Sequence, residues 1–217
     1  MIPIIRMFGV NQYYGRKKAL RDINLDIYEG EFIFISGPSG AGKSTLLKLL
    51  YLGEAASHGQ ILVDGVNLSR IVSKRIPFLR RKFGIVFQDY KLISSKTVFD
   101  NIALVLEAIG HKRRFIQKKV NSVLRSVGLE ERHNAFPLSL SGGEQQKIAV
   151  ARAIIGDPKI ILADEPTGSL DAKSANIIFE LLKRFHRRGG TVIVATHDME
   201  LIRKNKGRIF YLDKGVI

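Results

Sequence analysis

The stretch "EFIFISGPSGAGKST", residues 31–45, decides the fold of this chain of 217 residues. Its first part, Glu31–Ser36, is a short apolar run that predicts a buried strand, and it leads directly into a glycine-rich loop. The loop Gly37–Ser44 matches the pattern G-x-x-x-x-G-K-[ST] in full. Residues Lys43–Leu52 then repeat apolar positions at helical spacing. A strand, this loop and a helix, in that order, are the context in which the pattern binds nucleotide phosphates.

The composition of the loop follows from the chemistry of phosphate binding. Its glycines let the backbone wrap around phosphates with the N–H groups pointing inward. Lys43 can reach the β- and γ-phosphates, and the Ser44 hydroxyl can ligate Mg²⁺. The alternative is an ordinary glycine turn, which the flanking strand and helix argue against. The sequence therefore predicts binding of a nucleoside triphosphate with Mg²⁺, and the residues predicted to bind it are Gly37, Pro38, Ser39, Gly40, Ala41, Gly42, Lys43, Ser44 and Thr45.

Polar side chains also follow three other apolar runs, each where the predicted strand ends. The runs are 160–163 before Asp164 and Glu165, 191–195 before His197, and 84–87 before Gln88. Because the carboxyl ends of parallel strands meet at one edge of a sheet, we expect these side chains to lie beside the glycine loop. A single histidine at a strand end indicates little. The convergence of three strand ends on one loop indicates a site.

The two carboxylates are expected to divide the chemistry of hydrolysis. Asp164 would hold Mg²⁺ through water, and Glu165 would orient and polarise the attacking water. The alternative is that the pair caps a helix beginning near Pro166. Beside a phosphate loop we favour the catalytic interpretation. The predicted catalytic residues are Glu165, His197 and Gln88, and the predicted Mg²⁺ ligands are Ser44, Gln88 and Asp164.

The remaining patterns predict an α/β protein. Residues 1–30 alternate polar and apolar positions, which indicates antiparallel strands with a turn at Glu29-Gly30. A second strand pair is expected at Gly59–Val63 and near Val66, and residues 83–87 read as another strand.

The middle of the chain has a different pattern. Residues 90–155 lack strand signals and show helical periodicity. We therefore expect one domain over 1–217, in which 1–88 and 156–217 form an α/β core with an antiparallel β subdomain, and about 89–155 form an inserted helical subdomain.

The charge of the chain favours contact with anions. It has 35 Lys and Arg against 20 Asp and Glu, a formal net charge of +15. Nucleotide, nucleic acid and the inner face of a membrane all fit, and a merely solvated basic surface is the alternative. Aromatic residues do not interleave regularly with the basic ones, which argues against single-stranded nucleic acid. The basic clusters are Arg80–Lys82, Lys112–Arg114 with Lys118 and Lys119, Lys183 and Arg184 with Arg187 and Arg188, and Arg203–Arg208.

The lack of cysteine, the N-terminus and the length of the apolar runs exclude several classes of protein. The chain has no cysteine, so it has no disulfide framework, no thiolate zinc site and no cysteine nucleophile. The N-terminus lacks the long apolar core and the cleavage site of a secretion signal. The longest apolar runs fall far short of a spanning helix. We expect a cytoplasmic protein that meets the inner face of the cell membrane through a partner or through its charge.

A second glycine pair, in "LSLSGGEQQ" at residues 138–146, also suits a phosphate. Backbone N–H groups at a helix start point outward, and the helix dipole favours an anion. We expect a glycine turn followed by a helix beginning near Glu144. Two phosphate loops in one small domain are more than one nucleotide requires.

Taken together, the motifs resemble those of the ATP-binding cassette ATPases over nearly the whole chain. The motifs are the glycine loop at 37–45, Gln88, LSGGE at 140–144, the strand ending at 165, Ser169-Leu170-Asp171, and His197. The resemblance implies a P-loop NTPase fold with a RecA-like core, and a helical subdomain that carries the LSGGE motif, called here the signature. It also implies that Tyr14 stacks on adenine, with the neighbouring Tyr13 as the alternative.

The same resemblance explains the second glycine pair. In this family two copies sandwich two ATP molecules head to tail, so that each glycine loop faces the signature of the other copy. The residues expected to contact the partner's ATP are Ser141, Gly142, Gly143, Glu144 and Asp171, and Asp171 would also help to join the halves. Binding would close the homodimer, and hydrolysis through Glu165 would open it.

Within the family, the pattern of the cell-division members is followed by residues 78–104, by residues 140–154 with 163–171, and by residues 37–50. Lipoprotein-releasing and macrolide-export ATPases share the PTG-LD stretch at 166–171 and the general layout, whereas Gln88-Asp89 and residues 97–101 favour the cell-division type. That type implies an FtsX-like integral membrane partner and regulation of cell-wall hydrolysis. The partner's helix would lie in a groove near Gln88 formed by residues 89–110, and the candidate apolar contacts are Tyr90, Leu92, Ile93 and Val98. The alternative for each contact is internal packing.

Three rival functions differ from this one. An ATPase that drives lipoprotein release or efflux would have a partner with a large exterior binding domain. A DNA-repair or chromosome ATPase would use the basic surface on phosphates, but it would carry a coiled-coil insertion or cysteine zinc motifs, which this chain lacks. A purely structural nucleotide-binding module would be expected to lose Glu165 or His197, and both are present.

Overall fold

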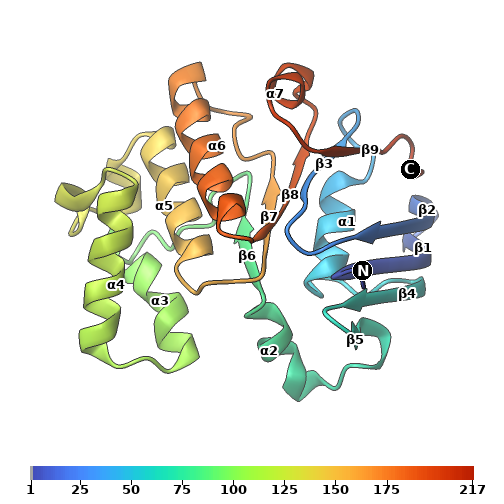
Figure 1. The fold of residues 1–217 in the computed structure, drawn as a ribbon, viewed down its shortest axis with the longest axis horizontal. Helices are drawn as coiled ribbons and strands as arrows, with labels where there is room; N and C mark the ends of the chain where they lie inside the picture. Colours follow the sequence, from blue (N-terminus) through green and yellow to red (C-terminus); the bar gives the residue numbers. More distant parts are fainter. Residues whose placement is uncertain (1) are drawn as a thin grey trace.

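A five-stranded parallel sheet forms the centre of the structure, a computed structural model that describes residues 2–217 (Figure 1). The strand order is β6-β7-β8-β3-β9, and each neighbouring pair is parallel. The strands are β3 Phe32–Ser36, β6 Phe83–Val86, β7 Ile160–Asp164, β8 Thr191–Thr196 and β9 Arg208–Tyr211. β3 and β8 are buried at every residue, because helices or the second sheet cover both faces. This confirms the strands predicted from continuous apolar runs.

A second, antiparallel sheet packs beside the first in the order β2-β1-β4-β5. Its strands are β1 Ile5–Tyr14, β2 Lys17–Ile27, β4 His58–Val63 and β5 Val66–Asn67. The two predicted strand pairs and the turn at Glu29-Gly30 are confirmed. One hydrophobic cluster joins this sheet, helix α1 (Lys43–Leu50) and one face of the parallel sheet.

The helices lie mainly on the other face of the parallel sheet. They are α2 Ile76–Arg80, α3 Val98–Ile109, α4 Arg113–Ser126, α5 Gly142–Ile154, α6 Ala172–Arg187 and α7 Met199–Lys204, with short 3-10 turns at Leu68–Arg70, Ser73–Arg75, Glu130–Arg132 and Pro137–Ser139. None of the helices within residues 2–217 is long and apolar enough to cross a membrane. Helix α1 ends two residues earlier than predicted, because Leu52 has a left-handed backbone (φ 54°).

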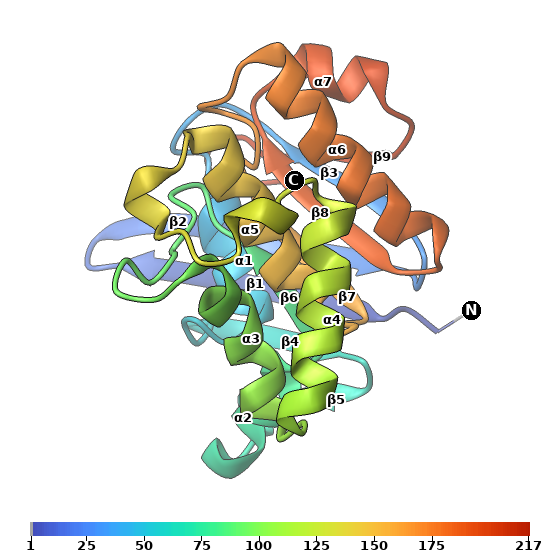
Figure 2. The same ribbon diagram turned by 90° about the vertical axis from the view of Figure 1, so that its left-hand side faces the viewer.

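Helices α3, α4 and α5 form a layer at one side of the molecule, seen face-on in Figure 2. The expected helical segment is confirmed, since residues 90–155 of the described chain contain no strand. However, its hydrophobic cluster continues into the parallel sheet and α6, where the rings of Phe34 and Phe179 stack at 6.1 Å. The helical segment therefore shares its hydrophobic core with the parallel sheet. That it forms a subdomain of its own stays a prediction.

Candidate functional site

A cavity of about 300 Å³ opens at the carboxyl end of the parallel sheet. The glycine loop and α1 form one wall, and the residues after β6, β7 and β8 supply Gln88, Glu165 and His197. The three strand ends thus meet at the glycine loop, as expected for parallel strands. The lining residues are Tyr14, Lys17, Ala19, Ser39, Gly40, Gly42, Lys43, Ser44, Thr45, Gln88, Glu165 and His197.

Two glycines of the loop cannot be replaced, because their φ angles are positive and a side chain would clash with neighbouring backbone atoms. Gly37 has φ +149°, and a Cβ atom there would lie 1.9 Å from the carbonyl oxygen of Leu212. Gly42 has φ +110°, and its Cβ would lie 2.7 Å from the carbonyl oxygen of Ala19. These are backbone clashes in a region that L residues rarely adopt. The loop therefore keeps its shape only with glycine at both positions.

The glycine loop folds around the ammonium group of Lys43, which donates hydrogen bonds to it. Its Nζ donates hydrogen bonds to the carbonyl oxygens of Gly37 (2.8 Å) and Pro38 (3.1 Å). It also lies 3.5 Å from Oε1 of Glu165, and its side chain is 7% exposed. The Lys43 ammonium is therefore positioned at the loop, where it and the loop N–H groups can bind the oxygens of a polyphosphate.

Glu165 is held rigidly at the other wall. Its backbone is left-handed (φ 44°), and its N–H donates to the carbonyl oxygen of Ala195 at 2.9 Å. Its Oε1 lies 2.8 Å from Nδ1 of His197. No helix begins at Pro166, since the next helix, α6, starts at Ala172. The helix-cap alternative is therefore wrong, and a strained backbone at a cavity wall is typical of functional residues.

Asp164 lies at the end of β7, behind Glu165. Burial raises the pKa of Asp164, and the nearby Ser44 hydroxyl opposes that increase. Its buried Oδ1 has no hydrogen-bond partner within the described residues. A hydroxyl, a carboxylate with a free oxygen and the amide of Gln88 are oxygen donors of the kind that Mg²⁺ prefers. The predicted Mg²⁺ residues therefore fit such an ion.

The signature region forms the N-terminus of α5, which begins at Gly142, two residues before the predicted start. Ser141 is the N-cap, and its Oγ accepts from the N–H of Glu144. In return, a carboxylate oxygen of Glu144 accepts from the N–H of Ser141 at 2.9 Å. The backbone hydrogen bond from Ser141 lowers the pKa of Glu144. The two glycines are therefore the first residues of a helix, because this capping box closes around them.

This geometry changes the expected role of Glu144. Its carboxylate is used by Ser141 and lies 3.3 Å from Nε of Arg132. A carboxylate directed at a phosphate would also repel it. We therefore propose that Glu144 positions the Ser141 loop, and its direct contact with the partner's ATP stays a prediction.

The remaining residue predicted to contact the partner's ATP is Asp171, which lies near the signature. It caps α6 by accepting hydrogen bonds from the N–H groups of Lys173 and Ser174, both at 2.9 Å. These hydrogen bonds lower the pKa of Asp171. A Cβ on Gly143 would lie 2.8 Å from Oγ of Ser174, so the first turns of α5 and α6 are in contact. Two helix N-termini thus meet on one surface, and none of the residues predicted to contact a partner's ATP lines the cavity.

The structure separates the two tyrosines that were candidates for adenine stacking. Tyr14 lines the cavity, its ring is partly exposed, and its hydroxyl donates to the Glu54 carboxylate. Tyr13 points to the other face of β1, where its ring meets His58 edge-on at 6.0 Å and Lys18 at 5.4 Å. Alternating side chains of a strand face opposite sides, which is why neighbours differ. The placement favours Tyr14.

We therefore expect Tyr14→Ala to weaken ATP binding, because base–aromatic stacking contributes about 1–3 kcal/mol, roughly 5- to 150-fold in affinity. Tyr13→Ala is the matched control and should change the dissociation constant little. Titration with a fluorescent ATP analogue measures both variants. An equal loss in both, or in Tyr13→Ala alone, would contradict the assignment.

An apolar groove is present near Gln88, where the partner was expected to dock, but three of the four predicted contacts do not line it. A mainly apolar groove of about 620 Å³ runs beside β6, between α2 and α3. Of the four candidates only Ile93 lines it. Val98 is fully buried in the helical core, and Leu92 packs against that core. Tyr90 instead places its hydroxyl 3.2 Å from Oγ of Ser169.

Other lining residues were not named in advance. Leu104 and Ala108 line the groove from α3, inside the predicted range 89–110, whereas Pro77 of α2 and Arg81 just after it lie outside that range. Their spacing of four residues on each helix marks one face, but a sequence pattern does not tell an outer face from an inner one. Only the packing of α3 on α5 shows which face is left open.

Comparison with known proteins agrees with this site. The sequence profile of the family described as "ABC transporter" matches residues 20–168. The cell division ATP-binding protein FtsE of Bacillus subtilis is 45% identical over 205 residues, covering 94% of this chain and 90% of that protein. The methionine import ATP-binding protein MetN of Vibrio vulnificus is 44% identical, covering 91% of this chain but 60% of MetN. A dimeric ATP-binding cassette, MJ0796, in a post-hydrolysis state with ADP and Pi, superposes with a TM-score of 0.91 and 36% identity, covering 98% of this chain and 96% of that one.

Proposed function

This chain belongs to the ABC transporter family, and from that premise we propose that it is the ATP-hydrolysing subunit of an FtsEX-like complex. In this proposal, ATP-driven dimerisation acts on an integral membrane partner that regulates cell-wall hydrolysis during bacterial cell division. The chain is an ABC ATPase that binds ATP. Its similarity to FtsE over nearly the full length of both chains supports the division role.

The observation that carries the mechanism is the separation of the two groups of phosphate-binding residues. The glycine loop lines its own cavity, whereas Ser141 and the paired glycines lie outside that cavity. A second copy placed head to tail would bring the N-terminus of its α5 to the γ-phosphate, with the positive end of the helix facing it. The dimeric state of the cassette MJ0796 supports this arrangement.

The residues of the cavity divide the work of hydrolysis. The amides of the glycine loop and the Lys43 ammonium bind and orient the phosphates. Glu165 orients the attacking water and takes up its proton at Oε1 or Oε2, and His197 fixes that carboxylate through the 2.8 Å contact to Oε1. Ser44, Gln88 and Asp164 would hold Mg²⁺, which neutralises charge on the β- and γ-phosphates. Closure of the second copy would exclude bulk water from this site.

The membrane partner is proposed to dock in the groove between α2 and α3. The groove is mainly apolar, with Ile93, Leu104 and Ile109 among its lining residues, and it suits the apolar face of a short helix. Docking of an FtsX-like protein there would hold this chain at the inner face of the cell membrane. Lys91 also lines the groove, and it lies three residues after Gln88, which lines the cavity. The same loop therefore borders both the docking groove and the cavity.

A capture experiment tests this proposal. We expect the tagged chain to retain one integral membrane protein from detergent-solubilised membranes of the source cell, and mass spectrometry to identify it as FtsX-like. Leu104→Asp puts a charge in the groove and should abolish capture. The control is Ile209→Asp, an equally drastic change at a half-exposed residue of β9, outside the groove. Thermal unfolding verifies that both variants fold.

One outcome would count against the division role, and another against docking in the groove. Capture of a partner with a large exterior substrate-binding domain would indicate transport. That second candidate, an ATPase for import, lipoprotein release or efflux, is supported by the 44% identity to MetN. Capture that survives Leu104→Asp would instead show that the partner docks elsewhere.

A further inference from the structure

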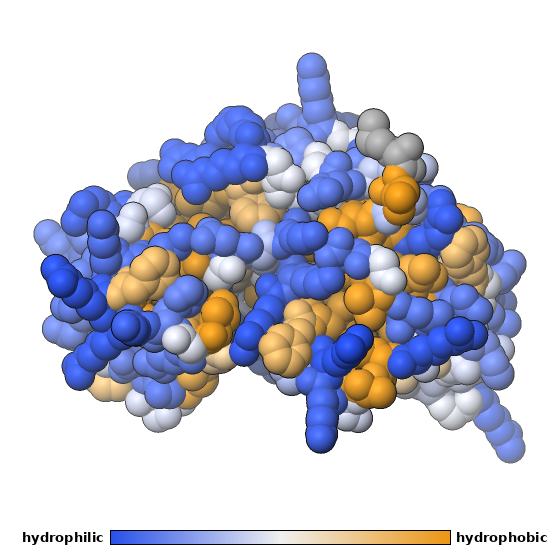
Figure 3. Space-filling model, turned by 60° about the horizontal axis from the view of Figure 1, so that its bottom comes forward, coloured by the Kyte–Doolittle hydropathy of each residue, from blue (hydrophilic) through white to orange (hydrophobic). Residues whose placement is uncertain are grey.

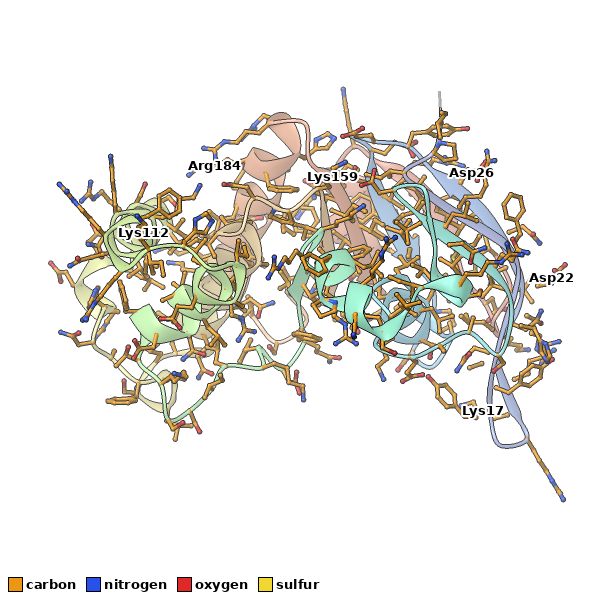
Figure 4. All side chains as sticks on the ribbon, turned by 90° about the horizontal axis from the view of Figure 1, so that it is seen from below. Lys17, Asp22, Asp26, Lys112, Lys159 and Arg184 are labelled. Carbon is orange, nitrogen blue, oxygen red and sulfur yellow. The ribbon has the colours of Figure 1, made fainter. Side chains whose placement is uncertain are left out.

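Two basic clusters flank the partner groove at the lower end of the molecule. The α2 cluster comprises Arg70, Lys74, Arg75, Arg80 and Arg81, and the α4 cluster comprises Lys112, Arg113 and Arg114. Figures 1 and 2 both show α2 and the turn between α3 and α4 at this end. Arg81 joins the two sides by donating to the carbonyl oxygen of Ala108 at 2.8 Å. In Figure 4, which looks onto this end, Lys112 extends outward from α4.

The charge of this surface is not compensated by neighbouring carboxylates. Residues 69–82 contain six basic and no acidic side chains, and only Lys82 has a carboxylate partner, Asp64 at 2.6 Å. Arg80 donates to backbone carbonyls of Tyr51 and Leu52, which leaves its charge in place. Residues 108–119 also lack a carboxylate. The surface therefore attracts an extended anion.

Apolar side chains project from the same surface, between the cations. Val72 is 61% exposed, Phe78 60% and Phe115 45%. The Arg81 guanidinium lies 5.0 Å from the ring centre of Phe78. Beneath Phe78 a shallow apolar cavity of about 310 Å³ reaches Leu79. Figure 3 shows apolar side chains gathered on this side of the molecule with hydrophilic residues around them.

We propose that this surface lies directly on an anionic lipid bilayer. Clusters of four to eight Lys and Arg beside exposed aromatic residues are typical of proteins that bind such membranes. The basic side chains would contact headgroup phosphates, and Val72, Phe78 and Phe115 would enter the interface. An acidic protein segment would match the cations alone. The apolar side chains instead stand on both rims of the groove, so they face a broad surface and not a single peptide.

The placement agrees with the partner groove. An integral membrane protein docked between α2 and α3 would turn both rims of the groove toward the bilayer. This part of the argument rests on the proposed function. Lipid binding itself needs no partner. Vesicles made of lipid alone therefore test the inference separately, and a failure of partner capture would leave their result unaffected.

The experiment is co-sedimentation of the purified chain with vesicles of phosphatidylcholine, with or without phosphatidylglycerol. We expect binding only to the anionic vesicles, weakened by salt. Each cation near an anionic surface changes affinity about fivefold, so Lys74→Glu with Arg75→Glu should weaken binding about 25-fold or more. The matched control is Arg184→Glu with Arg188→Glu, the same change in charge at two exposed residues at the end of α6. It should stay within about twofold, because screening limits distant charges.

A second pair of changes tests the apolar part. The double change Val72→Ser with Phe78→Ser replaces exposed apolar side chains, so folding should be retained. It should weaken vesicle binding about tenfold or more and leave the salt dependence of binding unchanged. Failure of the wild-type chain to bind anionic vesicles would overturn the inference. Equal weakening by the α6 control would also overturn it, by showing unspecific attraction. Binding only when the vesicles carry the membrane partner would assign the clusters to protein contact instead.

Discussion

Replacement of the carboxylate that we propose activates the attacking water, Glu165→Gln, should abolish ATP hydrolysis while ATP still binds. Glutamine keeps the size of the side chain but cannot accept a proton from water, and loss of a general base costs about 10²- to 10⁴-fold in rate. Binding is retained because Lys43 is held independently by the carbonyls of Gly37 and Pro38. Removal of a negative charge 3.5 Å from Lys43 even increases the positive field at the phosphates.

A further consequence concerns the assembly state. If ATP binding closes the dimer and hydrolysis opens it, a chain that binds without hydrolysing should accumulate as a closed dimer. Phosphate release, nucleotide titration and size-exclusion chromatography with ATP and Mg²⁺ measure the three properties. The control is Glu180→Gln, the same substitution at a half-exposed ion pair with Lys183 on α6. An unchanged hydrolysis rate in Glu165→Gln would show that this carboxylate is not the base.

The second large effect is expected at the signature, from Gly143→Asp. Gly143 lies outside the cavity, so the dissociation constant for ATP should change little. In the composite dimer, however, the new carboxylate would face the partner's γ-phosphate. Two like charges about 4 Å apart near a protein surface repel by about 4 kcal/mol, which corresponds to roughly a thousandfold loss of closure and hydrolysis. The helix itself should form, because an acidic residue in the first turn favours the dipole.

Steric effects and charge effects can be separated at this position. A Cβ atom on Gly143 meets Oγ of Ser174 at 2.8 Å, a side chain that can move. Gly143→Ala adds that Cβ without charge, and it should retain most of the activity. Normal hydrolysis by Gly143→Asp would contradict a site shared between two copies.

Mixing two inactive variants gives a more direct test of sharing. Lys43→Ala loses its own phosphate site, and Gly143→Asp spoils only the site of its partner. A mixed dimer then has one doubly damaged site and one intact site, so an equal mixture should recover about a quarter of the wild-type rate if copies exchange freely and the sites act independently. Failure of the mixture to exceed either variant alone would count against the head-to-tail dimer.

Much of the fold and of the cavity was predictable because it depends on contiguous residues. The strand, loop and helix around Gly37–Ser44 are local in sequence, and polar residues after parallel strands meet at one edge by topology alone. The helix start at Gly142 was also within reach, since Ser141 and Glu144 have the spacing of a capping box. There the glycine pair was interpreted as a turn, and the reciprocal cap outweighs the low helix propensity of glycine.

The sequence by itself determined that this chain binds a nucleotide, and it predicted that the glycine loop and the carboxylate of Glu165 meet at one cavity, because those features depend on residue type and strand order. Only the tertiary structure decided that Val98 is core and not partner contact, that Tyr14 and not Tyr13 faces the cavity, and that the signature lies outside the cavity. These depend on packing between segments far apart in the chain. Burial and facing direction are properties of that packing, and no local pattern specifies them.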